Sequence, residues 1–194
     1  ALPIYGPIFS DAITIYNQNN YFGNFKPFGE YNLRYSFTKD QEFINSFNQY
    51  NHQERGDFYC LNESQFKSFQ VQTELDHGIL VPLHFINERF NNFKLVAMSY
   101  GSFSHHRLMK NGEILGDFIN QINKRVVVIA SGDMSHALKD SGPYEYHEDG
   151  KKFDQEIKMK LSHNKPYEIF KFPQEIIENA KECGLRSYAL LMGI

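Results

Sequence analysis

The amino-acid sequence predicts an α/β fold: a single domain with a mostly parallel central sheet flanked by helices. The first reason is that continuous β-branched stretches such as RVVVIASG (residues 125–132) are typical of strands buried on both faces. The second is that these stretches alternate along the chain with segments whose apolar residues recur every three or four positions, as in helices. The length of 194 residues suits one domain, which we expect to extend over residues 1–194.

The expected elements follow in the order strand, helix, strand, helix, helix. In the helix expected at residues 39–50, Phe43, Ile44 and Phe47 form one apolar face, and Pro173 and Gly184 bound the last expected helix. Residues 78–86 (GILVPLHFI) are apolar enough to be buried, but their period does not separate helix from strand. Strands are expected at residues 12–17, 32–37, 91–101 and 125–132, and helices at residues 39–50, 111–124, 151–164 and 172–183.

Composition and charge exclude several classes of function. The formal net charge of −3 gives no support for a nucleic-acid or anionic-membrane partner. No run of 18 apolar residues exists, so the sequence contains no expected membrane span. Cys60 and Cys183 are too few for a disulfide framework, which predicts a reducing, cytoplasmic location.

Polar residues directly follow the strand expected at residues 125–132. In open α/β sheets ligands bind beyond the carboxyl ends of the strands, so Asp133, Ser135 and His136 stand where chemistry is expected. Ser135 and His136 are adjacent and make a poor nucleophile–base pair, and they lack the surroundings of a nucleophile elbow. The alternative is structural, because Ser and Asp also cap helices.

Two other positions carry candidate groups. His77, in LDHGILVPL, stands at the rim of an apolar segment, where an imidazole can move a proton; a simple Asp-His-Gly turn is the alternative. Glu182 and Cys183 are expected at a helix C-terminus, where a carboxylate opposes the helix dipole. A metal ion or an ion pair with Arg186 would each compensate it.

Four stretches, taken together, resemble those of a known superfamily. They occur in the order LDHGILVPLHFI, VVVIASGDMSHAL, SGPYEYHEDGKKFD and AKECGLRSYALLMGI. This set resembles the LigB-like superfamily: class III extradiol ring-cleavage dioxygenases of the subunit-B type, their Memo-like relatives, and the dioxygenase-like module associated with AMMECR1 domains and radical-SAM enzymes. The resemblance implies a LigB-like α/β fold, related to phosphorylase/hydrolase-like folds.

The resemblance also implies a chemistry and its residues. It implies a non-heme Fe(II) site that cleaves a catecholic ring with O₂, in which His77 and His136 transfer protons. Asp133 belongs to the same motif as His136. The C-terminal metal ligand of the family matches Glu182, and Cys183 matches a Cys used in Memo-like relatives. The implied partners are a small aromatic diol and O₂, and either a second copy of the chain or a component of an AMMECR1/radical-SAM-associated system.

The N-terminal end departs from the family pattern. The stretch IYGPIFSD places Tyr5 where the family has a metal-binding His, and a Pro-His-Pro-like first strand segment is not seen. The alternative is therefore a non-catalytic member that acts as a binding or partner subunit, with no metal. Zinc with hydrolytic chemistry is a third hypothesis. In the first hypothesis, His77, His136 and Glu182 should meet in one pocket.

Overall fold

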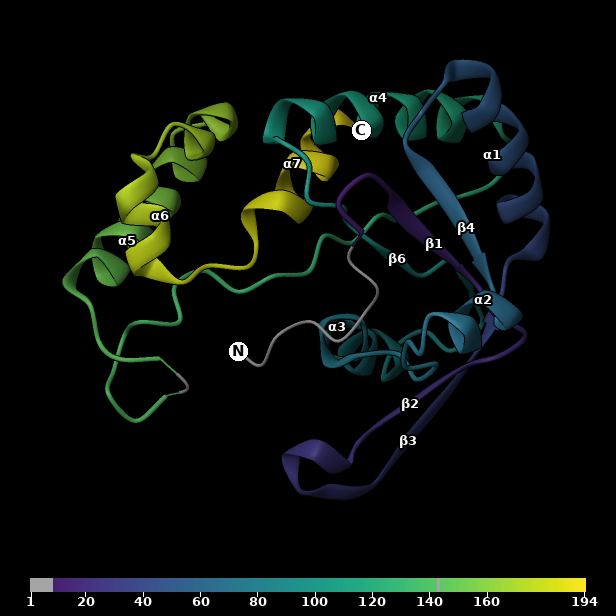
Figure 1. Ribbon diagram of the computed structural model, residues 1–194, viewed down its shortest axis with the longest axis horizontal. Coiled ribbons are helices and arrows are strands. Elements are labelled where there is room, and N and C mark those ends of the chain that lie inside the picture. Colours follow the sequence, from purple (N-terminus) through teal and green to yellow (C-terminus); the bar gives the residue numbers. More distant parts are fainter. Residues whose placement is uncertain (1–8, 143) are drawn as a thin grey trace. The chain divides into compact units, whose positions relative to one another are not determined.

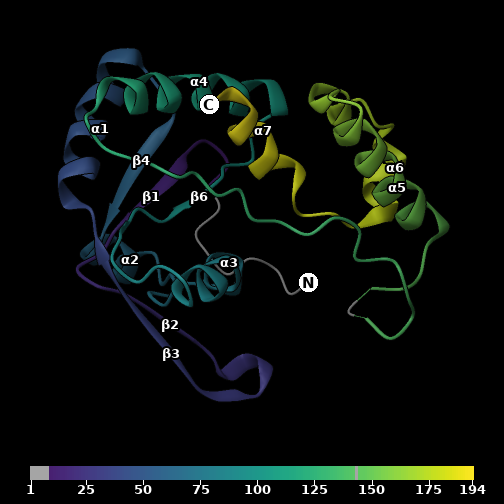
Figure 2. The ribbon, with the colours of Figure 1, turned by 180° about the vertical axis from the view of Figure 1, so that it is seen from behind.

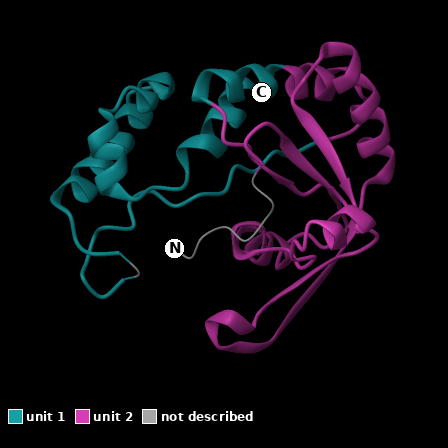
Figure 3. Cartoon of the chain, in the orientation of Figure 1, with its two compact units in different colours: residues 1–3, 104–113, 126–194 teal, residues 4–103, 114–125 magenta. Residues whose placement is uncertain are grey.

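The structure of the chain is a computed structural model that describes residues 9–142 and 144–194. These residues form two compact units (Figure 3). Unit 1 contains residues 104–113 and 126–194, and unit 2 contains residues 9–103 and 114–125, so helix α4 (His105–Gln121) is divided between them. Each unit has its own hydrophobic core. Among the helices described, none has the length and apolar character of a membrane span.

The first sheet of unit 2 contains strands β4, β1 and β6 in that order. Strand β1 (Ile13–Asn17) pairs in parallel with β4 (Phe58–Asn62) and antiparallel with the short β6 (Met98–Ser99). The first four residues of β1 are buried, as expected for a strand with a neighbour on each side. This sheet is mixed, and only one of its two pairings is parallel.

Helix α1 (Gln41–Glu54) covers this sheet with the apolar face that its spacing predicts. The Asp40 side chain accepts the Phe43 N–H and starts the helix. The ring of Phe47 meets that of Phe58 on β4 at 4.8 Å and that of Phe118 on α4 at 5.2 Å. The helix predicted at 39–50 is therefore confirmed.

The second sheet is a long hairpin with one short added strand. Strands β2 (Tyr21–Phe25) and β3 (Glu30–Lys39) run antiparallel, as both views of the ribbon show (Figures 1 and 2), and the 3-10 turn η1 (Lys26–Phe28) and Gly29 join them. Gly29 has φ of +84°, a conformation that favours glycine. Strand β5 (Lys94–Leu95) pairs in parallel with the end of β3.

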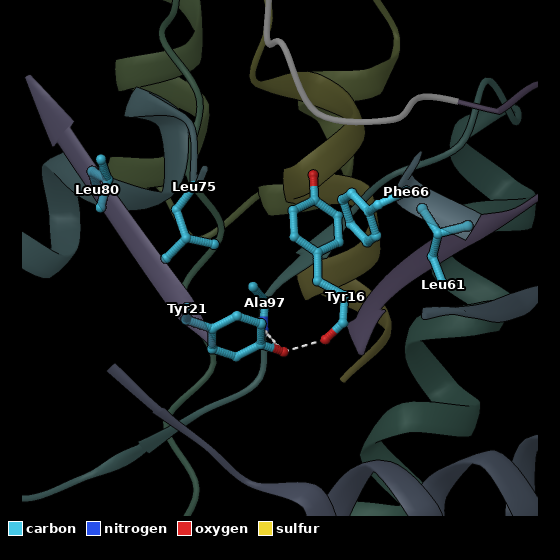
Figure 4. Packing of buried hydrophobic residues seen from close by; sticks show 7 residues of the cluster. All are labelled: Tyr16, Tyr21, Leu61, Phe66, Leu75, Leu80 and Ala97. Atoms are coloured by element: carbon cyan, nitrogen blue, oxygen red, sulfur yellow. Dashed lines mark hydrogen bonds between the residues drawn. The ribbon is translucent and has the colours of Figure 1, made fainter. Parts of the chain in front are cut away.

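One core of unit 2 lies between these strands, α2 (Glu63–Ser68) and α3 (His77–Asn87). Figure 4 shows the Tyr21 hydroxyl donating to the Tyr16 carbonyl, with the Tyr16 ring turned toward Phe66. The apolar stretch at 78–86, which period alone did not assign, is helical, and the Asp76 side chain caps it by accepting the Ile79 N–H. The cluster consists of Tyr16, Tyr21, Leu61, Phe66, Leu75, Leu80 and Ala97.

Unit 1 is helical. Helices α5 (Glu148–Ser162) and α6 (Gln174–Ala180) lie side by side (Figures 1 and 2), followed by α7 (Leu185–Gly193). The 3-10 turn η2 (Pro166–Phe170) completes the packing of the core. Phe153, Ile157, Ile169, Phe172, Ala180 and Leu185 make up that core.

The structure corrects three expectations. The mostly parallel central sheet is not confirmed, because the two sheets are small and mixed. Residues 125–132 form no strand and Val127 is 84% exposed, since β-propensity forms a strand only where a neighbour completes the ladder. The helix expected at 172–183 ends at Ala180, because Lys181 takes a left-handed conformation (φ +53°).

Candidate functional site

The candidate site of unit 1 is built on residues 131–137, here called the His136 loop. This loop is irregular, and side chains of α7 hold its first residues in place. The Ser187 hydroxyl donates to the Ser131 carbonyl (2.8 Å), and the Tyr188 hydroxyl donates to the Gly132 carbonyl (3.2 Å). The loop is thus positioned by residues more than fifty positions later in the sequence.

Two glycines, Gly132 and Gly184, allow the His136 loop to lie directly against the backbone before α7. A β-carbon on Gly132 would lie 2.4 Å from the α-carbon of Gly184, a distance at which one backbone must move. Gly184 directly follows Cys183, so the contact also brings that thiol against the loop. Only a residue without a β-carbon fits at position 132.

The His136 imidazole is enclosed on several sides. Its side chain is 8% exposed, and its ring stacks on the Tyr144 ring with 5.7 Å between centroids and 11° between planes. Its Nε2 lies 3.3 Å from Oδ2 of Asp133, whose side chain is 70% exposed. Its backbone N–H donates to the Ala180 carbonyl at the end of α6. The imidazole is therefore fixed in position, and its carboxylate partner faces water.

The Cys183 thiol lies close to the same imidazole nitrogen, Nε2 of His136. Its Sγ accepts the Asp133 N–H at 3.2 Å and is 3.8 Å from Nε2 of His136. Burial raises the pKa of the Cys183 thiol, the nearby Asp133 and Glu182 carboxylates raise it further, and the Asp133 N–H lowers it in part. At neutral pH Cys183 is a neutral thiol, so the arrangement does not make it an activated nucleophile.

Ser135 is a structural residue of the loop. Its buried hydroxyl donates to the Ala180 carbonyl (2.9 Å) and accepts the Ala137 N–H (3.0 Å). Its own N–H donates to Oδ1 of Asp154 on α5 at 2.8 Å. Because this hydroxyl donates its proton to a backbone carbonyl and not to the His136 imidazole, the geometry agrees with the argument against a Ser–His hydrolase pair.

Glu182 does not stand at a helix C-terminus, which corrects the sequence-based expectation. Helix α6 ends at Ala180, and Glu182 precedes the first turn of α7. Its Oε2 accepts the Leu185 N–H at 2.8 Å. A carboxylate at this end of a helix is favoured by the dipole and satisfies an otherwise open N–H, so neither a metal ion nor Arg186 is needed to explain it.

Comparison with known proteins places the whole arrangement in a family. The family model described as "Catalytic LigB subunit of aromatic ring-opening dioxygenase" matches residues 9–194. The chain belongs to the LigB family. This confirms the resemblance found in the four sequence stretches.

Individual relatives of the LigB-family chain differ in their descriptions. A protein of Clostridium acetobutylicum is 32% identical over 189 residues, which are 97% of this chain and 40% of the relative. A MEMO1 family protein of Methanosarcina mazei is 34% identical over 83 residues, which are 42% of this chain and 28% of the relative. A 2,3-dihydroxyphenylpropionate/2,3-dihydroxicinnamic acid 1,2-dioxygenase of Klebsiella pneumoniae is also 34% identical over 83 residues, 39% of this chain and 26% of the relative. The chain thus spans less than half the length of these relatives.

His77 of this LigB-family chain lies in unit 2, apart in the chain from the His136 loop. It is the first residue of α3, directly after the Asp76 cap, and its ring contacts the Phe28 ring at 5.3 Å. The Asp-His-Gly motif therefore starts a helix and is not an isolated turn. Because the two units are described separately, the meeting of His77 with His136 and Glu182 stays a prediction.

A metal site is not formed among the described residues of the LigB-family chain. Within residues 9–142 and 144–194, no three His, Cys, Asp or Glu side chains are grouped as metal ligands would be. Glu182 and Cys183 stay candidate ligands by resemblance, but the described residues do not complete a ligand set around them. Tyr5, at the position of a family metal His, lies outside the described residues.

Sequence reasoning missed two residues of the LigB-family site. Tyr144 stacks on His136, and Tyr188 binds the loop carbonyl of Gly132. Both tyrosines lie within the stretches that carried the resemblance, but no period or spacing marks them among twelve tyrosines. Burial raises the pKa of the Tyr188 phenol first of all, and the nearby thiol and carboxylates raise it further, so this hydroxyl stays a donor at neutral pH.

Proposed function

We propose that the chain provides the proton-transferring part of a class III extradiol-type site, which cleaves a catecholic ring with O₂. Family membership and the dioxygenase among the relatives support this reaction class. The observation that carries the proposal is the His136 imidazole, 8% exposed, with Nε2 3.3 Å from a carboxylate that itself faces solvent.

The role of His136 follows from that geometry. A catechol must lose a proton before its ring is opened, and a positioned imidazole is the side chain best suited to accept it near neutral pH. Asp133 stabilises the imidazolium that forms and connects it to water, and the Tyr144 ring keeps the imidazole plane fixed. His77 is the second proton-transfer group that we propose, on the basis of the resemblance alone.

Fe(II) is the cofactor implied by the resemblance, with zinc as the alternative metal. Glu182 offers a carboxylate and Cys183 a neutral thiol, and the described residues add no third ligand to this pair. This set does not fit a two-His-one-carboxylate centre. The chemistry that we assign to this chain's own residues is therefore limited to proton transfer and substrate orientation.

The incomplete ligand set favours a second candidate function. In this candidate, the chain is a non-catalytic LigB-family member that binds an aromatic diol or a partner subunit through the residues around His136. Tyr5, which replaces an expected metal His, is the sequence feature that points the same way. This candidate predicts diol binding without metal and without oxygen consumption.

Oxygen uptake separates the two candidates. The purified chain is supplied with Fe(II) under argon, its bound iron is measured, and oxygen consumption is followed with catechol and with 2,3-dihydroxyphenylpropionate. Stoichiometric iron with a yellow, diol-dependent product supports ring cleavage. Diol binding by calorimetry without iron or oxygen uptake supports the binding subunit, and zinc-dependent ester hydrolysis contradicts both.

Two variants test the role of His136 itself. His136→Ala should lower turnover by about 10²- to 10⁴-fold, the usual contribution of a general acid–base group. The matched control is His52→Ala, which removes an exposed imidazole on α1 and should leave turnover unchanged. Full activity of a folded His136→Ala protein would remove His136 from the mechanism.

A further inference from the structure

The tip of the β2–β3 hairpin places an aromatic ring on His77, within unit 2. The tip is the 3-10 turn η1 (Lys26–Phe28), which Gly29 closes. The Phe28 ring meets the His77 imidazole edge to face, with 5.3 Å between centroids and 63° between planes. The Phe25 ring lies behind Phe28, with 6.4 Å between their centroids. The hairpin thus forms an aromatic wall beside a candidate proton-transfer group.

The hairpin is attached to the rest of unit 2 by other bonds, one from each of its strands. On β2, the Phe22 carbonyl accepts the N–H of Leu75, just before α3, at 2.8 Å. On β3, the Tyr35 hydroxyl is hydrogen-bonded to Nδ1 of His84 on α3, also at 2.7 Å between the two atoms. Because these bonds do not involve the tip, the hairpin does not need the Phe28 ring to stay in place.

Unit 2 leaves much of the Phe28 ring uncovered. Phe28 is 52% exposed, and the His77 imidazole beside it is half-buried. Exposure alone is common among surface rings. Tyr31 on the same hairpin, for example, is 65% exposed, but within the described residues no ring contact joins it to a candidate site group. What distinguishes Phe28 is that its uncovered surface adjoins an imidazole that a ligand is expected to reach.

We propose that Phe28 is a specificity-determining residue, which packs against the ring of an aromatic diol whose hydroxyl is hydrogen-bonded to His77. This proposal rests on the role of His77 in the proposed function. A hydroxyl that exchanges a proton with an imidazole comes within about 2.6–3.2 Å of its nitrogen, so the diol and Phe28 are neighbours of the same side chain. Aromatic rings attract one another when their centroids are about 4.5–7 Å apart, and a saturated ring lacks this attraction. Phe28 therefore selects a flat aromatic diol over a saturated one.

Fluorescence tests whether a diol reaches the hairpin tip. The chain contains no tryptophan, so Phe28→Trp introduces a single reporter at the proposed contact. Catechol, added under argon so that no ring is cleaved, should quench this fluorescence to saturation, with the dissociation constant that calorimetry gives for the parent chain. Tyr31→Trp is the matched control on the same hairpin, and catechol should leave its fluorescence without a saturable change.

Calorimetry tests the selectivity. Phe28→Ala should weaken catechol binding by about tenfold, because the ring contact is lost, and should change the binding of cis-1,2-cyclohexanediol much less. Phe28→Tyr keeps the ring and should bind catechol like the parent. Where the chain turns over, Phe28→Ala should raise KM at unchanged kcat, whereas His77→Gln should lower kcat. Circular dichroism checks that each variant folds.

The outcomes separate this proposal from the function on which it rests. A parent chain that binds no catechol contradicts the proposed function, and the role of Phe28 with it. If the parent binds catechol but Phe28→Ala binds it equally well, the proposed function stands and Phe28 is not part of the site. Quenching of Phe28→Trp that does not exceed that of Tyr31→Trp overturns the role of Phe28 in the same way.

Discussion

The two halves of residues 126–137 differ in where their backbone groups find partners. In the His136 loop, Ser187 and Tyr188 of α7 bind successive carbonyls, and Ala180 at the end of α6 accepts the His136 N–H. In Val126–Ala130, no such bond is made within the described chain, and Val127 is almost fully exposed. The geometry of the His136 loop therefore depends on residues forty to sixty positions later, whereas no described residue fixes the backbone of Val126–Ala130 through hydrogen bonds.

The contrast also teaches what keeps the candidate site together. The imidazole of His136 is oriented by a loop whose position is set by hydrogen bonds and by one contact between two glycines. Damage to that contact should therefore affect both stability and function. Substitutions of exposed side chains in Val126–Ala130 should change neither the stability nor the function of the chain.

The largest effect is expected at the glycine contact. Gly132→Val adds a β-carbon that would lie 2.4 Å from the α-carbon of Gly184, and two methyl groups beyond it, so the loop and the segment that contains Cys183 must separate. We expect a loss of about 3 kcal/mol in the free energy of unfolding, measured by urea denaturation. The control is Gly142→Ala, whose β-carbon would meet nothing nearer than 3.7 Å and should change stability little. Equal stabilities for the two variants would show that the loop is not tied to Gly184.

The next effect is expected at Ser135. Ser135→Ala removes a buried hydroxyl and leaves the Ala137 N–H without its acceptor, which should cost about 2 kcal/mol. The exposed Ser162 hydroxyl, which donates to the Lys158 carbonyl, supplies the control, and Ser162→Ala should lie within about 0.5 kcal/mol of the parent. If Ser135→Ala is fully stable but inactive, Ser135 acts in the chemistry and its structural role is refuted.

A smaller effect is expected at Glu182. Glu182→Ala removes the acceptor of the Leu185 N–H and should cost about 1 kcal/mol, the usual value of a helix cap. Glu182→Gln keeps an acceptor oxygen and should cost less. The same pair of variants distinguishes a cap from a metal ligand, because a ligand role predicts that Glu182→Gln loses bound iron while remaining stable.

Local patterns in the sequence were sufficient where neighbours in the chain decide the structure. The spacing of Phe43, Ile44 and Phe47 predicts the helix at 39–50, and Asp40 caps it. Strand β1 is predicted by its apolar residues. Motifs also led to the right family. The pairing of His136 with Asp133 lies within one short loop, which is why a motif could point to both residues.

Tertiary context decided what the sequence could not predict. RVVVIASG has the composition of a buried strand, but composition does not supply the neighbouring strand that would bury it. The sequence predicts the wrong helix end for Glu182, because no residue in AKECG (residues 180–184) indicates the left-handed conformation of Lys181. The stacking of Tyr144 on His136 depends on how the loop before α5 returns, and no local period encodes that path.

The smallest effect is expected in Val126–Ala130, and it tests most directly how this segment differs from the His136 loop. Val127→Ala, measured by urea denaturation, should change the free energy of unfolding by less than about 0.5 kcal/mol, since an exposed side chain loses little burial. Ile157→Ala in the core of unit 1 sets the scale, because a buried isoleucine costs about 2–5 kcal/mol when truncated. A Val127→Ala cost near that of Ile157→Ala would mean that the isolated chain already buries this segment. The difference between the two halves of residues 126–137 would then disappear.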